Sequence, residues 1–334
     1  MMNEYEEILK TLIDKCEGNI EDSWSDIIER YDLGVHKDTL RKAFAVSDFS
    51  GYNVYKYMKE KMVVDIRDSM EFKNENINDR ILCLSDFHVP FQLPVETFSS
   101  YVGVTDTLVL NGDIVDCTSI SKFPKLYRSD LMEDMIVARQ YIIELVEFIK
   151  PKRVFILDGN HDTRLGSYLA KKVDYDVANL LPNSVNELIC NDGFYRINKK
   201  TRTKEYFTPL SDVMIDMGVY FTYANDWKYQ IGDTIFCHPL AYNSPMMKTA
   251  EKAMLWFRNE GYDFRMLVMA HTHRVGSYYV GNTCLIEQGC CCNTKENNYN
   301  DGKLINSQKE GCVYFCQDKD GNTIREFTKI QVLN

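Results

Sequence analysis

The sequence predicts an α/β domain that follows a small all-helical N-terminal module. Short apolar runs each end in a carboxylate, glycine or asparagine, as in "RILCLSD" (80–86), "TLVLNGD" (107–113) and "RVFILDGN" (153–160). Such continuous runs are typical of strands that are buried on both faces. Between the last two runs, "LMEDMIVARQYIIELVEFIKP" (131–151) has the spacing of an amphipathic helix ended by proline. Strands alternating with helices indicate a parallel sheet.

Residues 1–75 have a different pattern, with apolar residues at helical spacing and no strand signal. Within them, "DSWSDIIERYDLGVHKDTLRKAF" (22–44) contains two short helical patterns separated by Gly34. A glycine turn between two short helices favours a helix-turn-helix-like module over residues 1–75. This module either contacts DNA or a protein, or it is a plain helical appendage. After a polar linker, residues 80–334 form the α/β domain.

The second half of the chain continues the α/β pattern after a long connection. We expect strands in "DTIFCHP" (233–239) and "MLVMAHTH" (266–273), a helix around 246–260, and further strands up to residue 332. Residues 165–233 exceed a minimal connection and are expected to form a cap. Within this segment, "YRINKKTRTKEY" (195–206) is locally basic. It is interpreted either as a hairpin that holds a nucleic-acid backbone or as an exposed turn.

Composition and charge limit the classes of protein to which this chain can belong. The chain has 39 Lys and Arg against 49 Asp and Glu, a formal charge of −10, which does not favour nonspecific binding to nucleic acid. No apolar run approaches the roughly 20 residues of a membrane span, and the first residues lack the apolar region of a signal peptide. Eleven cysteines without framework spacing are typical of reduced thiols. We therefore expect a cytoplasmic protein without a membrane partner. The consecutive cysteines 290–292 are expected to be buried thiols, because adjacent residues cannot all face one zinc ion.

Residues with metal-binding chemistry follow the predicted strands. Five of the six histidines lie in these strand-end turns. The turns contain Asp86, His88, Asp113, Asp116, Asn160, His161, Asp162, His238, His271 and His273. Ligands of open α/β sheets gather at the carboxyl ends of strands. Residues i and i+2 of an extended segment face the same side, so Asp86 with His88, and His271 with His273, are each expected to face one place.

This residue set predicts a site for two metal ions. Imidazole and carboxylate ligands suit Mn²⁺, Fe or Zn²⁺ better than Ca²⁺, and we favour Mn²⁺. Seven of these residues are candidate ligands, which is too many for one such ion. Two ions roughly 3.5–4 Å apart need a carboxylate that bridges them.

The ordered motifs "DFH", "GDIVD", "GNHD", "CHP" and "AHTH" resemble those of the calcineurin-like metallophosphoesterase superfamily, over about residues 80–330. The resemblance implies a four-layer α/β/β/α sandwich with two sheets flanked by helices. It implies that Asp113 bridges the two metal ions. It further implies that the first ion is held by Asp86, His88 and His273, and the second by Asn160, His238 and His271. With Asp113, these are the seven candidate ligands.

The resemblance also implies a mechanism in which a metal-bridging hydroxide attacks phosphorus in line. His161 would protonate or stabilise the leaving oxygen, with Asp162 orienting its ring. Asp116 would hydrogen-bond a ligand histidine. Asp162 and Asp116 are alternatively helix N-caps. Arg164 either clamps a substrate phosphate or forms a structural salt bridge.

The motifs narrow the activity that the resemblance implies. The protein Ser/Thr phosphatase branch usually reads G-D-x-x-D-R-G and G-N-H-E, whereas this chain reads "GDIVDCT" and "GNHD". Ala270 stands where the family commonly has glycine before the His-x-His. We expect a phosphodiesterase acting on DNA or RNA, hence nuclease-like. The alternatives are a small-nucleotide or cyclic-nucleotide phosphohydrolase and, in another class, a DNA-binding or assembly module with a structural metal site.

Overall fold

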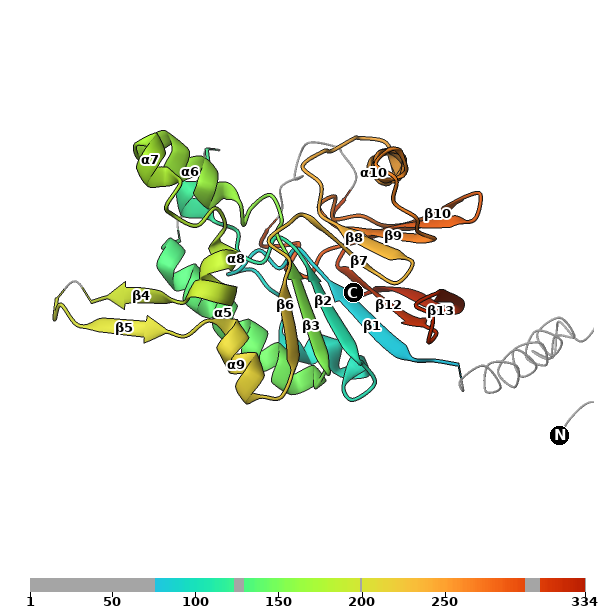
Figure 1. The fold of residues 1–334 in the computed structure, drawn as a ribbon, viewed down its shortest axis with the longest axis horizontal. Helices are drawn as coiled ribbons and strands as arrows, with labels where there is room; N and C mark the ends of the chain where they lie inside the picture. Colours follow the sequence, from blue (N-terminus) through green and yellow to red (C-terminus); the bar gives the residue numbers. More distant parts are fainter. Residues whose placement is uncertain (1–75, 123–128, 199, 298–306, 334) are drawn as a thin grey trace, which may run out of the picture. The chain divides into compact units, whose positions relative to one another are not determined.

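The structure is a computed structural model that describes residues 76–122, 129–198, 200–297 and 307–333 (Figure 1). The predicted helical module over residues 1–75, with its helix-turn-helix-like pattern, lies outside the described residues. Within the described ranges, no helix combines the length and apolar character that a membrane crossing needs.

A six-stranded sheet forms the centre of the domain. Strands β1, β2, β3 and β6 are parallel. Strand β12 pairs antiparallel with β1, and β13 pairs antiparallel with β12 at the edge of the sheet. In spatial order the strands are β13 (Thr323–Val332), β12 (Gly311–Gln317), β1 (Asp79–Leu84), β2 (Thr107–Asn111), β3 (Arg153–Leu157) and β6 (Tyr220–Tyr223). The three apolar runs predicted as buried strands are therefore neighbours at the centre of one sheet.

A second sheet has five strands and packs against the first. Its centre is parallel, with β8 beside β9 and β9 beside β11, and its two outer strands, β10 and β7, are antiparallel. The order is β10 (Val275–Val280), β11 (Thr283–Gln288), β9 (Met266–Met269), β8 (Thr234–Cys237) and β7 (Lys228–Ile231). Because the two sheets pack against each other, residues that follow the strands of both sheets can contribute to one site.

Helices cover the outer faces of both sheets. Helix α5 (Leu131–Ile149) begins after the N-cap Asp130, whose side chain accepts a hydrogen bond from the backbone N–H of Met132, and ends at Lys150 in a left-handed conformation. Helix α10 (Lys248–Asn259) lies beyond the five-stranded sheet (Figure 1). Among the described residues, the other helical segments are η1 (Val95–Tyr101), η2 (Thr118–Ile120), α6 (Arg164–Lys172), α7 (Tyr175–Ala178), α8 (Val185–Glu187), η3 (Leu188–Asp192) and α9 (Leu210–Asp216).

Three apolar cores hold four layers together. Alternate residues of a strand face opposite sides. Accordingly, Leu82 and Leu84 of β1 pack towards α5, whereas Ile81 and Cys83 pack between the two sheets. The third core lies between the five-stranded sheet and α10, and it contains Phe257. The layers are helix, sheet, sheet and helix, which confirms the predicted α/β/β/α sandwich for the described domain.

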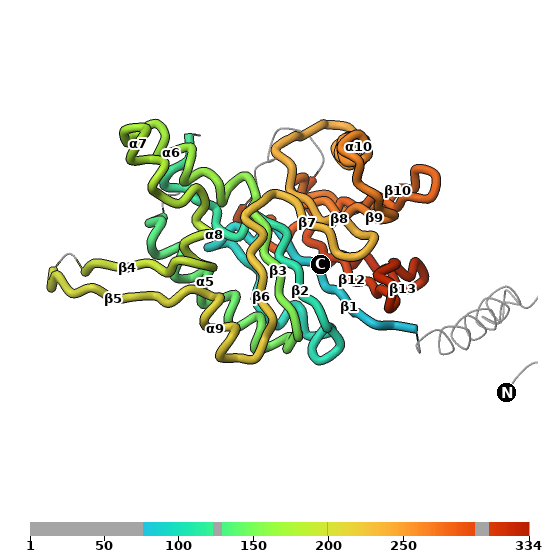
Figure 2. The backbone as a smooth tube through the Cα atoms, in the orientation of Figure 1, coloured from blue at the N-terminus to red at the C-terminus, as the bar shows by residue number. Residues whose placement is uncertain are grey.

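The segment expected to form a cap, residues 165–233, contributes to several parts of the domain. Its last part supplies β6 to the first sheet and β7 to the second. Its middle part includes a separate two-stranded hairpin of β4 (Phe194–Ile197) and β5 (Lys204–Phe207). Figure 2 shows this hairpin extending away from both sheets. The basic stretch 195–206 forms this hairpin, a shape that both interpretations of the stretch allow.

Candidate metal centre

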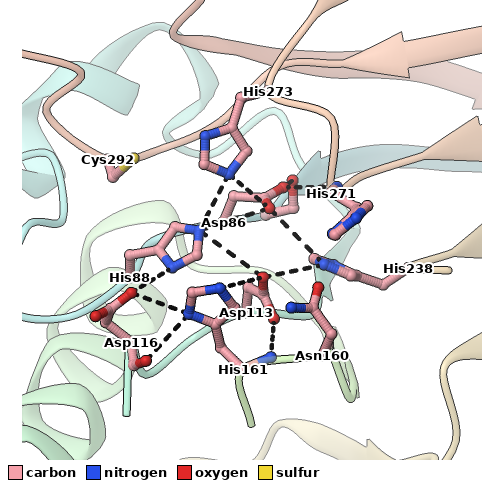
Figure 3. Close-up of polar contacts among 12 residues, drawn as sticks. Asp86, His88, Asp113, Asp116, Asn160, His161, His238, His271, His273 and Cys292 are labelled. Carbon is pink, nitrogen blue, oxygen red and sulfur yellow. Dashed lines mark hydrogen bonds and ion pairs between the residues drawn. The ribbon is translucent and has the colours of Figure 1, made fainter. Parts of the chain in front are cut away.

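The candidate ligands meet where the strand ends of the two sheets converge. Asp86, Asp113 and Asn160 follow β1, β2 and β3 of the first sheet. From the second sheet, His238 follows β8, and the His-x-His pair at 271 and 273 follows β9. Figure 3 shows these side chains pointing towards one another. Neither sheet alone supplies the complete set.

The expected extended geometry of the two i, i+2 pairs is wrong. The φ angles are 54° at Asp86, 48° at His88, 80° at His271 and 54° at His273, so all four residues are left-handed. Asp113 is left-handed as well, with φ of 52°. Non-glycine residues adopt this conformation at a cost, and such residues cluster at functional sites. The tight turns let the side chains of one short segment reach different neighbours.

Two motif glycines allow the strand-end turns to approach closely. A Cβ atom at Gly112 would lie 2.6 Å from Nδ1 of His238 and 2.7 Å from the backbone nitrogen of Gly159. A Cβ atom at Gly159 would overlap the side chain of Asp113. The glycines that precede Asp113 and Asn160 are therefore needed for space beside the candidate ligands.

Asp86, His88 and His273 form the first group of candidate ligands. Nε2 of His273 lies 3.1 Å from Oδ1 of Asp86, and Nε2 of His88 lies 3.8 Å from the same oxygen. The other oxygen of Asp86 accepts hydrogen bonds from the Ser85 hydroxyl at 2.6 Å and the backbone N–H of His271 at 3.2 Å. Oδ2 of Asp86 is thus held by hydrogen bonds from the protein, and Oδ1 faces His88 and His273.

Asp113, His238 and His271 form the second group, with ligand atoms within 4.8 Å of one another. Oδ1 of Asp113 accepts the backbone N–H of His161 at 2.7 Å. Oδ2 of Asp113 lies 3.2 Å from Nε2 of His238 and 3.8 Å from Nε2 of His88. Asp113 therefore lies between the two groups, and Asn160 lies beside it and His238 in Figure 3.

Three of the histidines are oriented through their Nδ1 atoms. His238 donates from Nδ1 to the backbone carbonyl of Asn111 at 2.8 Å. Nδ1 of His88 is 3.2 Å from Oδ1 of Asp116. The side-chain amide nitrogen of Gln308 lies 2.7 Å from Nδ1 of His273, and with the amide oxygen and nitrogen exchanged its oxygen, otherwise unpaired among the described residues, would accept the Nδ1 proton there. Such outer partners fix the ring of a metal-binding histidine and leave Nε2 as the ligand atom. Gln308 had no motif signal and was missed by sequence reasoning.

His161 is oriented by Asp116 and Arg164. Its Nδ1 lies 2.9 Å from Oδ1 and 3.0 Å from the backbone carbonyl of Asp116. Arg164 donates to Nε2 of His161 at 2.7 Å and to the carbonyl of Asp116 at 2.8 Å. Burial, with His88 and Arg164 nearby, lowers the pKa of His161 below its usual value despite the opposing effect of Asp113. Neither expected role of Arg164 includes this contact with the imidazole.

The expected contact between Asp162 and His161 is replaced by another arrangement. The carboxylate of Asp162 accepts backbone N–H groups from Ile114 and Val115, each at 3.1 Å, and from Gly159 at 2.9 Å. Asp162 thus joins the turn after β2 to the turn after β3. Burial, followed by the charge of Asp113, raises the pKa of Asp162 to about 8. Asp116, rather than Asp162, contacts the ring of His161.

The side chains of the three consecutive cysteines at 290–292 point to two different sides. All three thiols are buried, as expected, and Cys291 belongs to the core under α5. Cys290 and Cys292, however, have sulfur atoms within 4.8 Å of each other and of a ring nitrogen of His273. Alternation along an extended segment is the sequence signal that separates them from Cys291. They are close to the first group without belonging to the predicted ligand set.

Opposite charges compensate each other in the centre. Burial alone would raise the pKa of Asp86, but His273 and His238 outweigh it and hold that pKa well below its usual range. Burial also opposes the charge of His238, yet Asp113 and Asp86 raise the pKa of His238 to about 9. Burial and the neighbouring His238 lower the pKa of His271 to about 4. The carboxylates therefore favour a positive charge on His238 and not on the neighbouring His271.

The residues fit divalent transition metals. Within the described residues, the buried Oδ1 atom of Asn160 has no hydrogen-bond partner. Nε2 of His88 and Nε2 of His273 are only 3.0 Å apart. Nitrogen and oxygen ligands held towards common points are what Mn²⁺, Fe and Zn²⁺ bind. Both groups of candidate ligands are therefore suitable for a cation.

Comparisons with known proteins found one matching family and several similar solved structures. The sequence profile of a family described as calcineurin-like phosphoesterase (Metallophos) matches residues 79–275. No curated protein sequence matches the chain. Similar solved structures include vacuolar protein sorting 29 from Cryptosporidium parvum, with 14% identity, 77% of this chain and 98% of that chain covered, and a TM-score of 0.33. Another is a metallophosphoesterase from Sphaerobacter thermophilus, with 15% identity, coverage of 77% and 88%, and a TM-score of 0.36. A third is described as a novel archaeal phosphodiesterase, with 13% identity, coverage of 76% and 99%, and a TM-score of 0.32.

Proposed function

The chain belongs to the calcineurin-like phosphoesterase family and is a metal-dependent phosphoesterase, and on this premise we propose that it is a two-metal phosphodiesterase acting on nucleic acid. The observation that carries the two-metal part is the position of Asp113. Its Oδ2 atom lies 3.2 Å from Nε2 of His238 and 3.8 Å from Nε2 of His88, between the two groups of candidate ligands.

Each group would hold one ion, and Asp113 would serve both. The first ion would be bound by Asp86, His88 and His273. The second would be bound by Asn160, His238 and His271. When bound, such ions lower the pKa of water, which provides a nucleophile at neutral pH, and they neutralise charge on phosphoryl oxygens.

The protein's own groups complete the reaction. The Nε2 atom of His161 is 3.9 Å from Oδ2 of Asp113, at the edge of the centre, so a protonated His161 is placed to donate to the leaving oxygen. Asp116 accepts a hydrogen bond from Nδ1 and stabilises the positive charge of that ring. In the resting arrangement Arg164 donates to Nε2 itself, so this contact has to open before a protonated His161 can donate from Nε2. The cation of Arg164 also adds to the attraction for an anionic substrate.

The hairpin β4–β5 supports the choice of nucleic acid as the substrate. The rings of Tyr195 and Tyr206 lie 4.7 Å apart between centroids, with planes inclined by 37°, and they remain 57% and 46% exposed. Lys204 lies over the ring of Tyr195, and Arg202 lies at the exposed tip. Exposed aromatic rings with cations suit bases and a phosphate backbone. A small nucleotide is the second candidate, because a chain with a net charge of −10 repels a long polyanion.

The activity is tested with bis-p-nitrophenyl phosphate and p-nitrophenyl phosphate in the presence of Mn²⁺. Diester hydrolysis should disappear with a chelator, return with Mn²⁺, and be lost in Asp113→Ala. The exposed Asp320→Ala is the matched control and should retain wild-type rates. Hydrolysis of the monoester alone, or diester hydrolysis that survives in Asp113→Ala, would contradict the proposal.

The nucleic-acid part has its own measurement. Arg202→Ala with Lys204→Ala should weaken binding of a single-stranded oligonucleotide and reduce the slope of log affinity against log salt. The control is Lys171→Ala with Lys172→Ala, which removes two exposed cations from α6. Equal effects of the two double variants would remove the hairpin from the nucleic-acid interface.

A further inference from the structure

A cavity of about 850 Å³ adjoins the second group of candidate ligands. Asn160 and His238 belong both to the cavity wall and to the candidate metal centre. The other walls come from the β6–β7 connection, the loop after β8, and α10. The volume falls within the roughly 300–1,000 Å³ of small-molecule sites. A phosphate at the centre would thus have one of its ester groups beside this cavity.

The cavity has flat apolar walls formed by two tryptophans. The rings of Trp227 and Trp256 are 5.3 Å apart between centroids, with planes inclined by 58°. Trp227 also stacks on Phe257 at 5.5 Å, which supports its position from behind. Trp256 remains 42% exposed although it lines the cavity. An exposed indole face is a surface on which a planar aromatic group stacks.

The polar groups of the cavity suit a neutral ligand with hydrogen-bonding edges. Asn183 and Asn225 line it, and a side-chain amide both donates and accepts. Besides His238, the charged residues of the lining are Asp158, Asp226 and Lys252. Positively charged residues do not outnumber negatively charged ones in this lining, so the cavity does not suit a second phosphate.

The cavity walls are tied to the metal centre by direct contacts. The backbone N–H of His238 donates to the carbonyl of Trp227 at 2.8 Å. Arg274, which follows the His-x-His pair and is 2% exposed, donates to the carbonyls of Asn243 and Pro245 at 3.0 and 3.1 Å. Arg274 therefore fixes the loop after β8 that forms one wall. Such a site binds with little reorganisation.

From this arrangement we propose that the cavity binds the base of the nucleoside esterified to the reacting phosphate, with Trp256 as the stacking face. The inference rests on the proposed function, since it assigns the organic part of that substrate. It applies equally to a free nucleotide ester and to one residue of a strand, because both present the same nucleoside phosphate.

Binding of a product-like ligand tests the cavity without turnover. On the full chain loaded with Mn²⁺, calorimetry compares thymidine 5′-phosphate with 2-deoxyribose 5-phosphate, which lacks only the base. We expect the nucleotide to bind about 10-fold more tightly, within the range of base–aromatic stacking. In Trp256→Ala, and in Trp256→Leu, which retains apolar bulk, the ratio should fall towards one. The control Tyr175→Ala removes a 77% exposed ring of α7 outside the cavity and should keep the ratio.

Equal affinities for the two ligands in the wild-type protein would overturn the inference, as would an unchanged ratio in a folded Trp256→Leu variant.

Hydrolysis of methyl p-nitrophenyl phosphate, a diester without a base, tests the proposed function separately. Its failure beside a retained nucleotide preference would reject the diesterase activity and keep the base site. Comparing p-nitrophenyl thymidine 5′-phosphate with a ten-residue oligothymidylate distinguishes a nucleoside of a free nucleotide ester from one that belongs to a strand. A Trp256-dependent rate on either substrate supports the cavity, and a Trp256-independent rate on both contradicts it.

Discussion

The Nε2 atoms of His88 and His273 lie 3.0 Å apart although the two residues are 185 positions apart in the chain. One follows a strand of the first sheet, and the other follows a strand of the second. Two imidazole nitrogens at this distance either share a proton or face a common cation. We interpret the pair as half of the first metal site.

Removal of His273 should therefore reduce metal content. We expect His273→Ala to bind about one ion per chain where the wild type binds about two, and to lose phosphodiester hydrolysis by on the order of 10²–10³. Metal analysis after gel filtration gives the stoichiometry. Gln308→Ala keeps the ligand and removes only its support, so it should bind the first ion about 10–100-fold more weakly and leave the second ion unaffected. A wild-type metal content in His273→Ala would be incompatible with this site.

Asp116 contacts both His88 and His161, at 3.2 and 2.9 Å from their Nδ1 atoms. Asp116→Ala should weaken the first metal about 10–100-fold and lower kcat at saturating metal. Asp116→Asn keeps one acceptor oxygen and should recover part of the metal affinity. Titration with Mn²⁺ followed by activity separates the two effects. Identical metal affinity in Asp116→Ala and wild type would mean that this carboxylate does not support His88.

His161 should affect chemistry without affecting metal binding. We expect His161→Ala to retain both ions and to lose about 10²–10⁴ in kcat, the usual contribution of a general acid. The loss should be larger for an alkyl ester than for a p-nitrophenyl ester, because p-nitrophenolate leaves without a proton. The comparison of the two leaving groups is the measurement. An equal loss for both esters would assign His161 to positioning rather than to proton donation.

Arg164 should set the pH range in which His161 is protonated. A cation beside the ring disfavours the imidazolium, and Arg164 contributes to the lowered pKa of His161. A general acid works below its pKa, so activity is lost as pH rises through that value. Arg164→Gln should therefore move the alkaline limb of kcat/KM to higher pH. A pH profile of the metal-saturated variant measures the shift, and a move to lower pH would contradict the assignment.

The glycine of the "GNHD" motif should be required for space. A Cβ atom at Gly159 would overlap the side chain of Asp113, so Gly159→Ala forces a turn beside the metal centre to move. Overpacking typically costs about 1–3 kcal/mol, and the variant should melt several degrees lower and bind metal more weakly. Gly276→Ala is the matched control, since its Cβ meets only the flexible side chain of Met247. Equal melting temperatures would show that the turn adapts freely.

Much of this protein was determined by the sequence itself. Strands β1, β2 and β3 were predictable because their continuous apolar runs suit burial on both faces, which is independent of the partner strand. The candidate ligands were also predictable, since chemistry-bearing residues directly follow those runs and the family motifs occur in order. Helix α5 was predictable from its apolar spacing and the proline after it.

Only the tertiary structure decided how these residues meet. The backbone N–H groups of Asp86 and His88 donate to the carbonyls of Gly112 and Asp113, and that of His271 donates to the carboxylate of Asp86. The left-handed turns at Asp86, His88, His271 and His273 involve contacts with segments distant in the chain, and no local pattern encodes them. The same holds for Asp116 replacing Asp162 beside His161, and for Gln308 behind His273. The cavity lined by Trp227 and Trp256 likewise joins residues of α10 to the β6–β7 connection. A motif specifies which groups are present, whereas distances between distant segments follow from the packing of the two sheets against each other.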